Sequence, residues 1–282
     1  MIEKYYNGVI EQVAGGIGNV EHNSILVRYS NDFSIWDLES VNHYKDQTDI
    51  FFTCHEFSYN KIAEAYEPYL GLIRQMFHKY CSGTLEEFME ECDVYKLQRP
   101  VFESYFEKGF CERTEQILID EVEYEQERMH SSIVTMLQKL SEICPIVIVL
   151  NRFQLASKST MQLTNRLLQT KNKNIGIVLG VNDVQSIPEF AHEEWDAICE
   201  SMDDRNMVYH IGNAGRNMEP DVMDYYSDYE SDDGYRKLNN LVYSLDFDQA
   251  DHHLSKIERR IKFDNFTISE KKHYQLLLLQ IM

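Results

Sequence analysis

The chain has 282 residues, 43% of them hydrophobic and 12% aromatic, which is enough for one large folded domain with an appendage, or for two domains. Its 47 acidic residues outnumber 27 basic ones, and the formal net charge of -20 argues against nucleic acid or an anionic membrane surface as the main partner. No signal peptide or membrane-spanning apolar stretch is recognisable, so we expect a cytoplasmic protein. The six cysteines are scattered and form no Cys-x-x-Cys pair, which indicates reduced structural thiols.

Short apolar runs along the chain predict buried strands. Three of them are rich in β-branched or aromatic residues, at 50–54, 145–150 and 175–180, and two shorter runs lie at 9–13 and 207–211. Helical stripes of apolar residues occupy 61–80 and 112–140, and a further helix is expected around 193–202. Strands that alternate with helices predict a doubly wound, mainly parallel α/β sheet of five strands within a domain spanning 1–215.

The chain changes character after residue 211. Residues 219–233 contain seven acids and no basic residue, and we interpret 216–235 as an exposed acidic linker. Apolar stripes predict helices at 238–245 and 247–261, and a capping box at Thr267–Glu270 opens a third, which is apolar almost all round. Residues 236–282 therefore look like helical hairpins in series, and the sequence leaves open whether they belong to a longer repeat array.

A glycine-rich turn follows the first predicted strand. A strand that leads through glycines into a helix can cradle a phosphate, because successive backbone N–H groups converge on the anion. A working P-loop ends in Gly-Lys-Ser/Thr, whereas here Gly15, Gly16 and Gly18 are followed by Asn19 and Val20. The lysine and the hydroxyl are both missing, so the turn is at most a degenerate phosphate loop, and plain turn chemistry is the alternative interpretation.

A second motif follows the strand at 145–150, and it resembles one family. In signalling ATPases of the STAND branch of the AAA+ class, this strand ends in two acids, followed by apolar-Gln-Trp-Ala-Asp and a serine that starts a helix. This sequence has Asn151 and Arg152 in place of the acids and Ser157 in place of the later aspartate. The part of the motif that it retains is Phe153, Gln154, Leu155, Ala156 and Ser159.

The resemblance covers about residues 8–211 and carries implications for the chemistry. In the family, the first acid organises magnesium and the second polarises the attacking water, and neither asparagine nor arginine can do so. It therefore implies a P-loop-type domain with no catalytic residues and no metal. Asn182 would occupy the position of a polar residue that contacts the γ-phosphate or water. The helices at 236–282 resemble the tetratricopeptide array that such proteins often carry.

We therefore expect a catalytically silent STAND-type module that acts as a scaffold or regulator, without a cofactor, and binds a protein partner through its C-terminal helices or acidic linker. Oligomerisation is left open. The alternative is a weak signalling switch that holds ATP or ADP at low affinity through the glycine turn, Arg152 and Asn182. A small hydrolase that uses His55 and Glu56 is a third interpretation, from another functional class.

Overall fold

The computed structural model describes residues 2–18, 23–29, 35–45, 49–58, 61–109, 111, 122–170, 172–182, 187–203, 208–211, 237–238, 240–242 and 246–261. Within these ranges, no helix is both long and apolar enough to cross a membrane. All six cysteines are free thiols.

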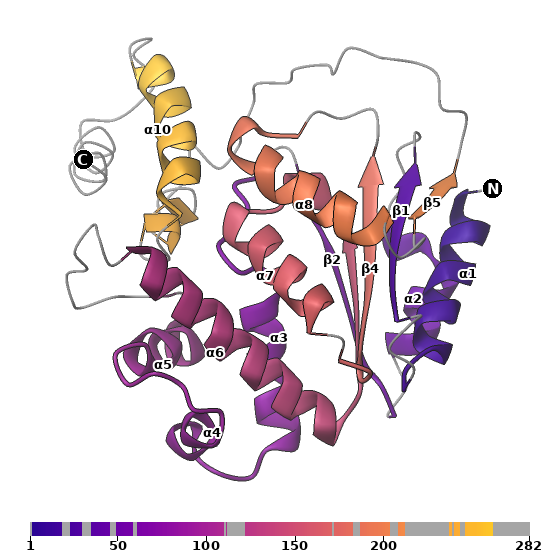
Figure 1. The fold of residues 1–282 in the computed structure, drawn as a ribbon, viewed down its shortest axis with the longest axis horizontal. Helices are drawn as coiled ribbons and strands as arrows, with labels where there is room; N and C mark the ends of the chain where they lie inside the picture. Colours follow the sequence, from indigo (N-terminus) through magenta and orange to yellow (C-terminus); the bar gives the residue numbers. More distant parts are fainter. Residues whose placement is uncertain are drawn as a thin grey trace.

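A parallel sheet forms the centre of the molecule (Figure 1). Its strands are β1 (Ser24–Tyr29), β2 (Phe51–Glu56), β3 (Ile146–Asn151), β4 (Ile175–Asn182) and β5 (Val208–Ile211), and they lie in the order β2-β3-β4-β1-β5. Every adjacent pair is parallel, so all carboxyl ends meet at one edge of the sheet. β3 and β4 are buried along their whole length, as expected for strands covered on both faces.

One face of the sheet is covered by the N-terminal part of the chain. α1 (Ile2–Gly15), η1 (Ile35–Asp37) and α2 (Glu39–Lys45) pack here, and Figure 1 shows α1 and α2 on this side of the sheet. The apolar stripe of α1 has helical spacing, and it meets alternate residues of β1, β3 and β4. The buried stripe residues are Tyr6, Val9, Ile10, Val13 and Ala14.

The opposite face is covered by more helices and forms a larger core. α3 (Tyr69–Tyr80), α6 (Val122–Ile143), α7 (Lys158–Gln169) and α8 (His192–Asp203) contribute to it, and η4 (Glu189–Ala191) precedes α8. α10 (Phe247–Ile261) joins the same core through Ala250 and Leu254, together with the helical residues Leu238, Leu241 and Val242. Figure 1 places α10 towards the end of the molecule where the strands finish.

Two short helices extend this layer. α4 (Leu85–Glu91) begins with a capping box in which the side chains of Thr84 and Glu87 each accept a hydrogen bond from the other residue's backbone N–H. α5 (Arg99–Lys108) has a proline in its first turn and ends at Gly109, whose φ of 83° suits glycine. These local signals fix the bounds of both helices.

The predicted α/β fold with a parallel sheet and helices is confirmed, and four of the five predicted strand segments form strands. The strand expected at 9–13 is wrong, because this segment lies inside α1. The strand that follows α1 in the chain is β1, which the sequence analysis did not identify. The helix expected from residue 61 begins at Tyr69, because Pro68 restricts the backbone before it. The acidic linker and the last predicted helix lie outside the described residues.

Candidate functional site at the carboxyl edge of the sheet

The strand order identifies where a ligand site is expected. The chain leaves β1 towards β2 on one side of the sheet and leaves β4 towards β5 on the other, although β1 and β4 are neighbours. Adjacent strands whose connections run in opposite directions form a topological switch point, and open α/β sheets bind ligands in the crevice beyond it. Tyr29 and Asn182 end these two strands and are paired in register, and Asn151 ends the next strand.

Tyrosine side chains lie around Asn151 at the end of β3. Asn151 is fully buried, and its Oδ1 accepts a hydrogen bond of 2.8 Å from Tyr29 Oη. Tyr6, also fully buried, lies edge-on to Tyr29 with 6.5 Å between the ring centroids. Among the described residues, Asn151 Nδ2 has no hydrogen-bond acceptor. Burial raises the pKa of Tyr6 well above its ordinary value, so its hydroxyl stays neutral.

Arg152, at the position of the second missing acid, forms an ion pair. Its Nη2 lies 3.5 Å from Glu56 Oε1, and both side chains are largely buried. The register of the sheet explains this contact, because Glu56 ends β2 directly opposite Asn151. Arg152 adopts a left-handed backbone conformation with φ of 53°, which turns the chain from β3 into η3 (Phe153–Leu155). The carboxylate of Glu56 therefore balances the charge of Arg152, which the alternative interpretation uses to hold ATP or ADP.

The retained glutamine joins the ends of β3 and β4. Gln154 is fully buried; its Nε2 donates to the carbonyl of Asn182 and its Oε1 accepts from the backbone N–H of Asn182, both at 3.4 Å. Asn182 is itself buried, 3% exposed. Gln154 thus ties the end of β3 to the end of β4, and the ring of Phe153 packs against Phe57 and Trp195.

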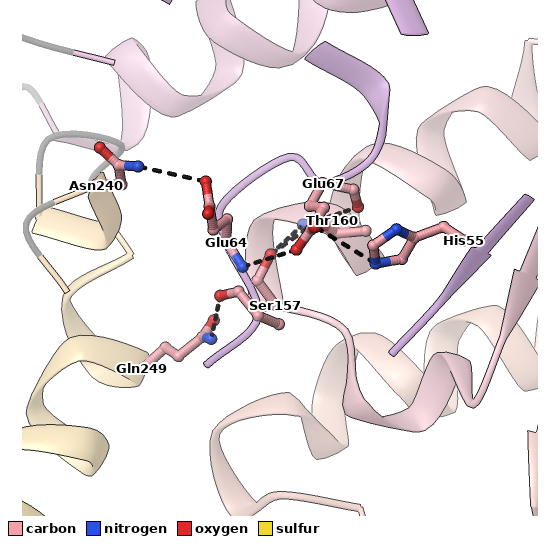
Figure 2. Close-up of polar contacts among 8 residues, drawn as sticks. His55, Glu64, Glu67, Ser157, Thr160, Asn240 and Gln249 are labelled. Carbon is pink, nitrogen blue, oxygen red and sulfur yellow. Dashed lines mark hydrogen bonds and ion pairs between the residues drawn. The ribbon is translucent and has the colours of Figure 1, made fainter. Parts of the chain in front are cut away.

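A second polar cluster lies where α7 begins (Figure 2). Ser157 caps α7 by accepting from Thr160 N, and Thr160 Oγ1 donates to the carbonyl of Glu67. Tyr66 N donates to Ser159 Oγ at 3.3 Å. Ser159 therefore anchors the turn before α3. Lys158 Nζ lies 2.9 Å from Asp248 Oδ2 and 3.7 Å from Glu194 Oε1.

The glycine turn lies at the other edge of the sheet. Gly15 ends α1, Gly16 N donates to the carbonyls of Gln12 and Val13, and Gly18 N donates to the carbonyl of Lys173, which precedes β4. The turn leads from a helix into the amino end of β1, so the strand-turn-helix geometry expected of a phosphate cradle is wrong here. Its amides at Gly16 and Gly18 close the helix and join it to the sheet. Asn19 and Val20 lie outside the described residues.

The histidine and acid considered for hydrolysis point to different partners. His55 Nε2 lies 3.5 Å from Glu67 Oε1, whereas Glu56 contacts Arg152. Burial, and secondarily the charge of Lys61, lowers the pKa of His55 to about 4, so the imidazole is neutral at pH 7. Within the described part of the chain, no three His, Cys, Asp or Glu side chains are grouped so that they could hold a metal ion.

Sequence reasoning did not identify Tyr6, Tyr29, Asp246 or Gln249 as residues near these clusters. The first two lie on elements whose type was wrong or unassigned, and only the strand order reveals that they meet Asn151. Comparison with protein-family models, curated proteins and solved structures gives no match for this chain. Its function has to be inferred from its own residues and topology.

Proposed function

We propose that this protein is a STAND/AAA+-like regulatory or scaffold module of P-loop type whose site no longer performs nucleotide chemistry, and that it acts through protein–protein contacts. AAA+ ATPases have the same strand order, with the phosphate-loop strand at the place of β1 and the acidic-pair strand at the place of β3. In this comparison, Asn151 and Arg152 at the end of β3 stand at the positions of the two acids. Asn182 at the end of β4 stands at the position of the polar residue.

In this proposal, the phosphate-loop position corresponds to the connection between β1 and α2. Its sequence is Ser30-Asn31-Asp32-Phe33-Ser34-Ile35-Trp36-Asp37-Leu38, without glycine, lysine or arginine. Two aspartates in this stretch would repel phosphate. This supports a loss of nucleotide affinity more directly than the glycine turn did.

The pairing of the nearby cations carries the proposal. Holding a nucleoside triphosphate requires positive charge or metal opposite its phosphates. Arg152 is paired with Glu56, and Lys158, at the start of α7, is paired with Asp248 and Glu194. The chain itself thus balances the charge of both cations. Several polar groups of the frame bond to one another without nucleotide: Tyr29 to Asn151, Gln154 to Asn182 and Arg152 to Glu56.

The alternative is a weak ATP or ADP switch with little hydrolysis. It is favoured by one observation: Asn182 ends β4 at the switch point, where a polar side chain could meet a phosphate. The partner in the scaffold interpretation would bind the C-terminal helices or the acidic linker. We do not propose hydrolysis by His55 and Glu56, since these side chains engage separate partners.

Nucleotide binding separates the two functions. We expect millimolar ATP or ADP with magnesium to leave the thermal midpoint unchanged, because ligand at 100 times its Kd would add about 2.7 kcal/mol and raise the midpoint by several degrees. Intrinsic fluorescence is a second readout, since Trp36 lies half exposed in the connection after β1. A shift that Arg152→Ala abolishes, and that the surface control Lys79→Ala retains, would establish the switch instead.

A further inference from the structure

The C-terminal helical residues are held to the core by a small set of polar contacts at the start of α10. Gln249 Oε1 accepts from Lys158 N at 3.2 Å, Gln249 Nε2 donates to the carbonyl of Ala63 at 3.1 Å, and Asn240 Nδ2 donates to Glu64 Oε2 at 3.4 Å. Figure 2 shows Asn240 and Gln249 reaching from this segment towards the turn that contains Glu64 and towards Ser157. We call these contacts, with Asp246 and Asp248, the clasp.

Gln249 satisfies a backbone group that a helix leaves open. Lys158 is the first residue of α7, and its N–H has no acceptor within that helix. A side chain from α10 supplies the acceptor across 91 residues of sequence. Docking of the C-terminal segment therefore completes the cap of α7, the helix that directly follows the motif at the carboxyl edge.

Asp246 is the unusual member of the clasp. It directly precedes α10, its carbonyl accepts from Ala250 N, and the residue is only 1% exposed. Neither carboxyl oxygen has a hydrogen bond of good geometry among the described residues. An ionised carboxylate buried in this way costs much more free energy than a protonated one.

The charges that face Asp246 come from two neighbouring helices. Lys158 and the polar groups of Ser159 on α7 favour the ionised form, and Glu194 on α8 disfavours it. Lys158 also forms ion pairs with Asp248 and Glu194, so its charge is shared among several acids. Burial outweighs the favourable contacts and raises the pKa of Asp246 to about 7.

We propose that the clasp is proton-sensitive: α10 docks on the core when Asp246 carries its proton and loosens when Asp246 is ionised. The docked form binds the proton more tightly than the released form, whose Asp246 has an ordinary carboxyl pKa. Docking is therefore strongest below about pH 4 and weakens as the pH rises towards about 7. This inference holds whether or not nucleotide binds.

Hydrogen exchange of the full chain, corrected for the intrinsic rate at each pH, measures the clasp. We expect the protection of peptides covering 246–261 and Lys158 to fall on the order of tenfold between pH 5.5 and pH 8. Asp246→Asn, which imitates the protonated acid, should keep high protection at both pH values.

Gln249→Ala provides a variant whose proton-binding group is unchanged. It should lower protection at both pH values while leaving their ratio intact, because it removes a docking contact without touching the carboxyl. Equal protection at pH 5.5 and pH 8 in the unmodified protein would overturn the proposal. So would an unchanged pH dependence in Asp246→Asn, since another group would then be responsible.

Discussion

Gly180 lies at the closest approach between β4 and the side chains that occupy the switch point. A Cβ added here would overlap Tyr6 Oη and would lie 2.5 Å from Asn151 Oδ1. Both neighbours are fully buried, so neither has room to withdraw. The glycine is thus required by the tyrosine and asparagine that occupy the site.

We expect Gly180→Ala to lower the free energy of unfolding by about 1–3 kcal/mol, because overpacking displaces buried groups. Urea denaturation measures this loss. Gly8→Ala is the matched control: its Cβ would meet nothing within 4 Å inside α1, so the better helix former should leave stability unchanged or slightly raised. Equal stability of both variants would show that the neighbours of Gly180 can yield.

Tyr29 supplies the hydrogen bond that Asn151 receives. Tyr29→Phe removes the donor and leaves the buried amide of Asn151 without a partner at either end, so we expect a loss of about 1–3 kcal/mol in urea unfolding. Tyr5→Phe, a change at an exposed tyrosine on α1, should have little effect. A neutral outcome for Tyr29→Phe would indicate that water replaces the hydroxyl.

At the scale of elements, α6 contains a buried histidine that should respond to acid. His130 is 4% exposed and packs edge-on against Tyr66, with 5.6 Å between the ring centroids. Burial lowers its pKa to about 4. The unfolded chain therefore binds a proton more readily than the folded one, and stability is lost as the pH falls from about 6.5 to about 4.

We expect His130→Phe to reduce this acid-dependent loss by up to about 3 kcal/mol, measured as the difference between urea unfolding at pH 7 and at pH 4.5. Asp246 titrates in the opposite sense over this range, so the comparison between variants is the informative quantity. Identical pH profiles for His130→Phe and the unmodified protein would contradict the assignment.

Sequence patterns predicted strands such as β3 and β4, which are buried on both faces. They failed in a segment whose apolar residues fit both the helical and the strand periodicity. The runs at β2, β3 and β4 are continuous and rich in β-branched or aromatic residues, so they were identified as strands. Val9, Ile10 and Val13 fit a helix stripe as well as a short strand, and the glycines after them favoured the wrong alternative. Asn151, Arg152 and Asn182 were found because they follow strong strands. Tyr6 and Tyr29 could not be predicted as neighbours of Asn151, because their position beside it depends on the order of the strands in the sheet.

At the scale of the whole molecule, the net charge of -20 opposes compaction. We expect the thermal midpoint at pH 7 to rise when NaCl is increased from about 20 mM to about 200 mM, because salt screens the repulsion between exposed acids. Sucrose at matched osmolality is a control for general solute effects. A falling midpoint would indicate that ion pairs such as Arg152–Glu56 contribute more than the repulsion.

The position of β1 in the sheet affects the order in which the chain can fold during synthesis. β1 is the first strand in the chain, yet its hydrogen-bond partners are β4 and β5, and Asn23 Nδ2 reaches the carbonyl of Ile175 across 152 residues. On the ribosome, β2 and β3 can pair while β1 still has no strand beside it. The nascent chain must therefore keep Ile25, Leu26 and Val27 from other contacts until β4 emerges, and folding of the sheet completes late in synthesis.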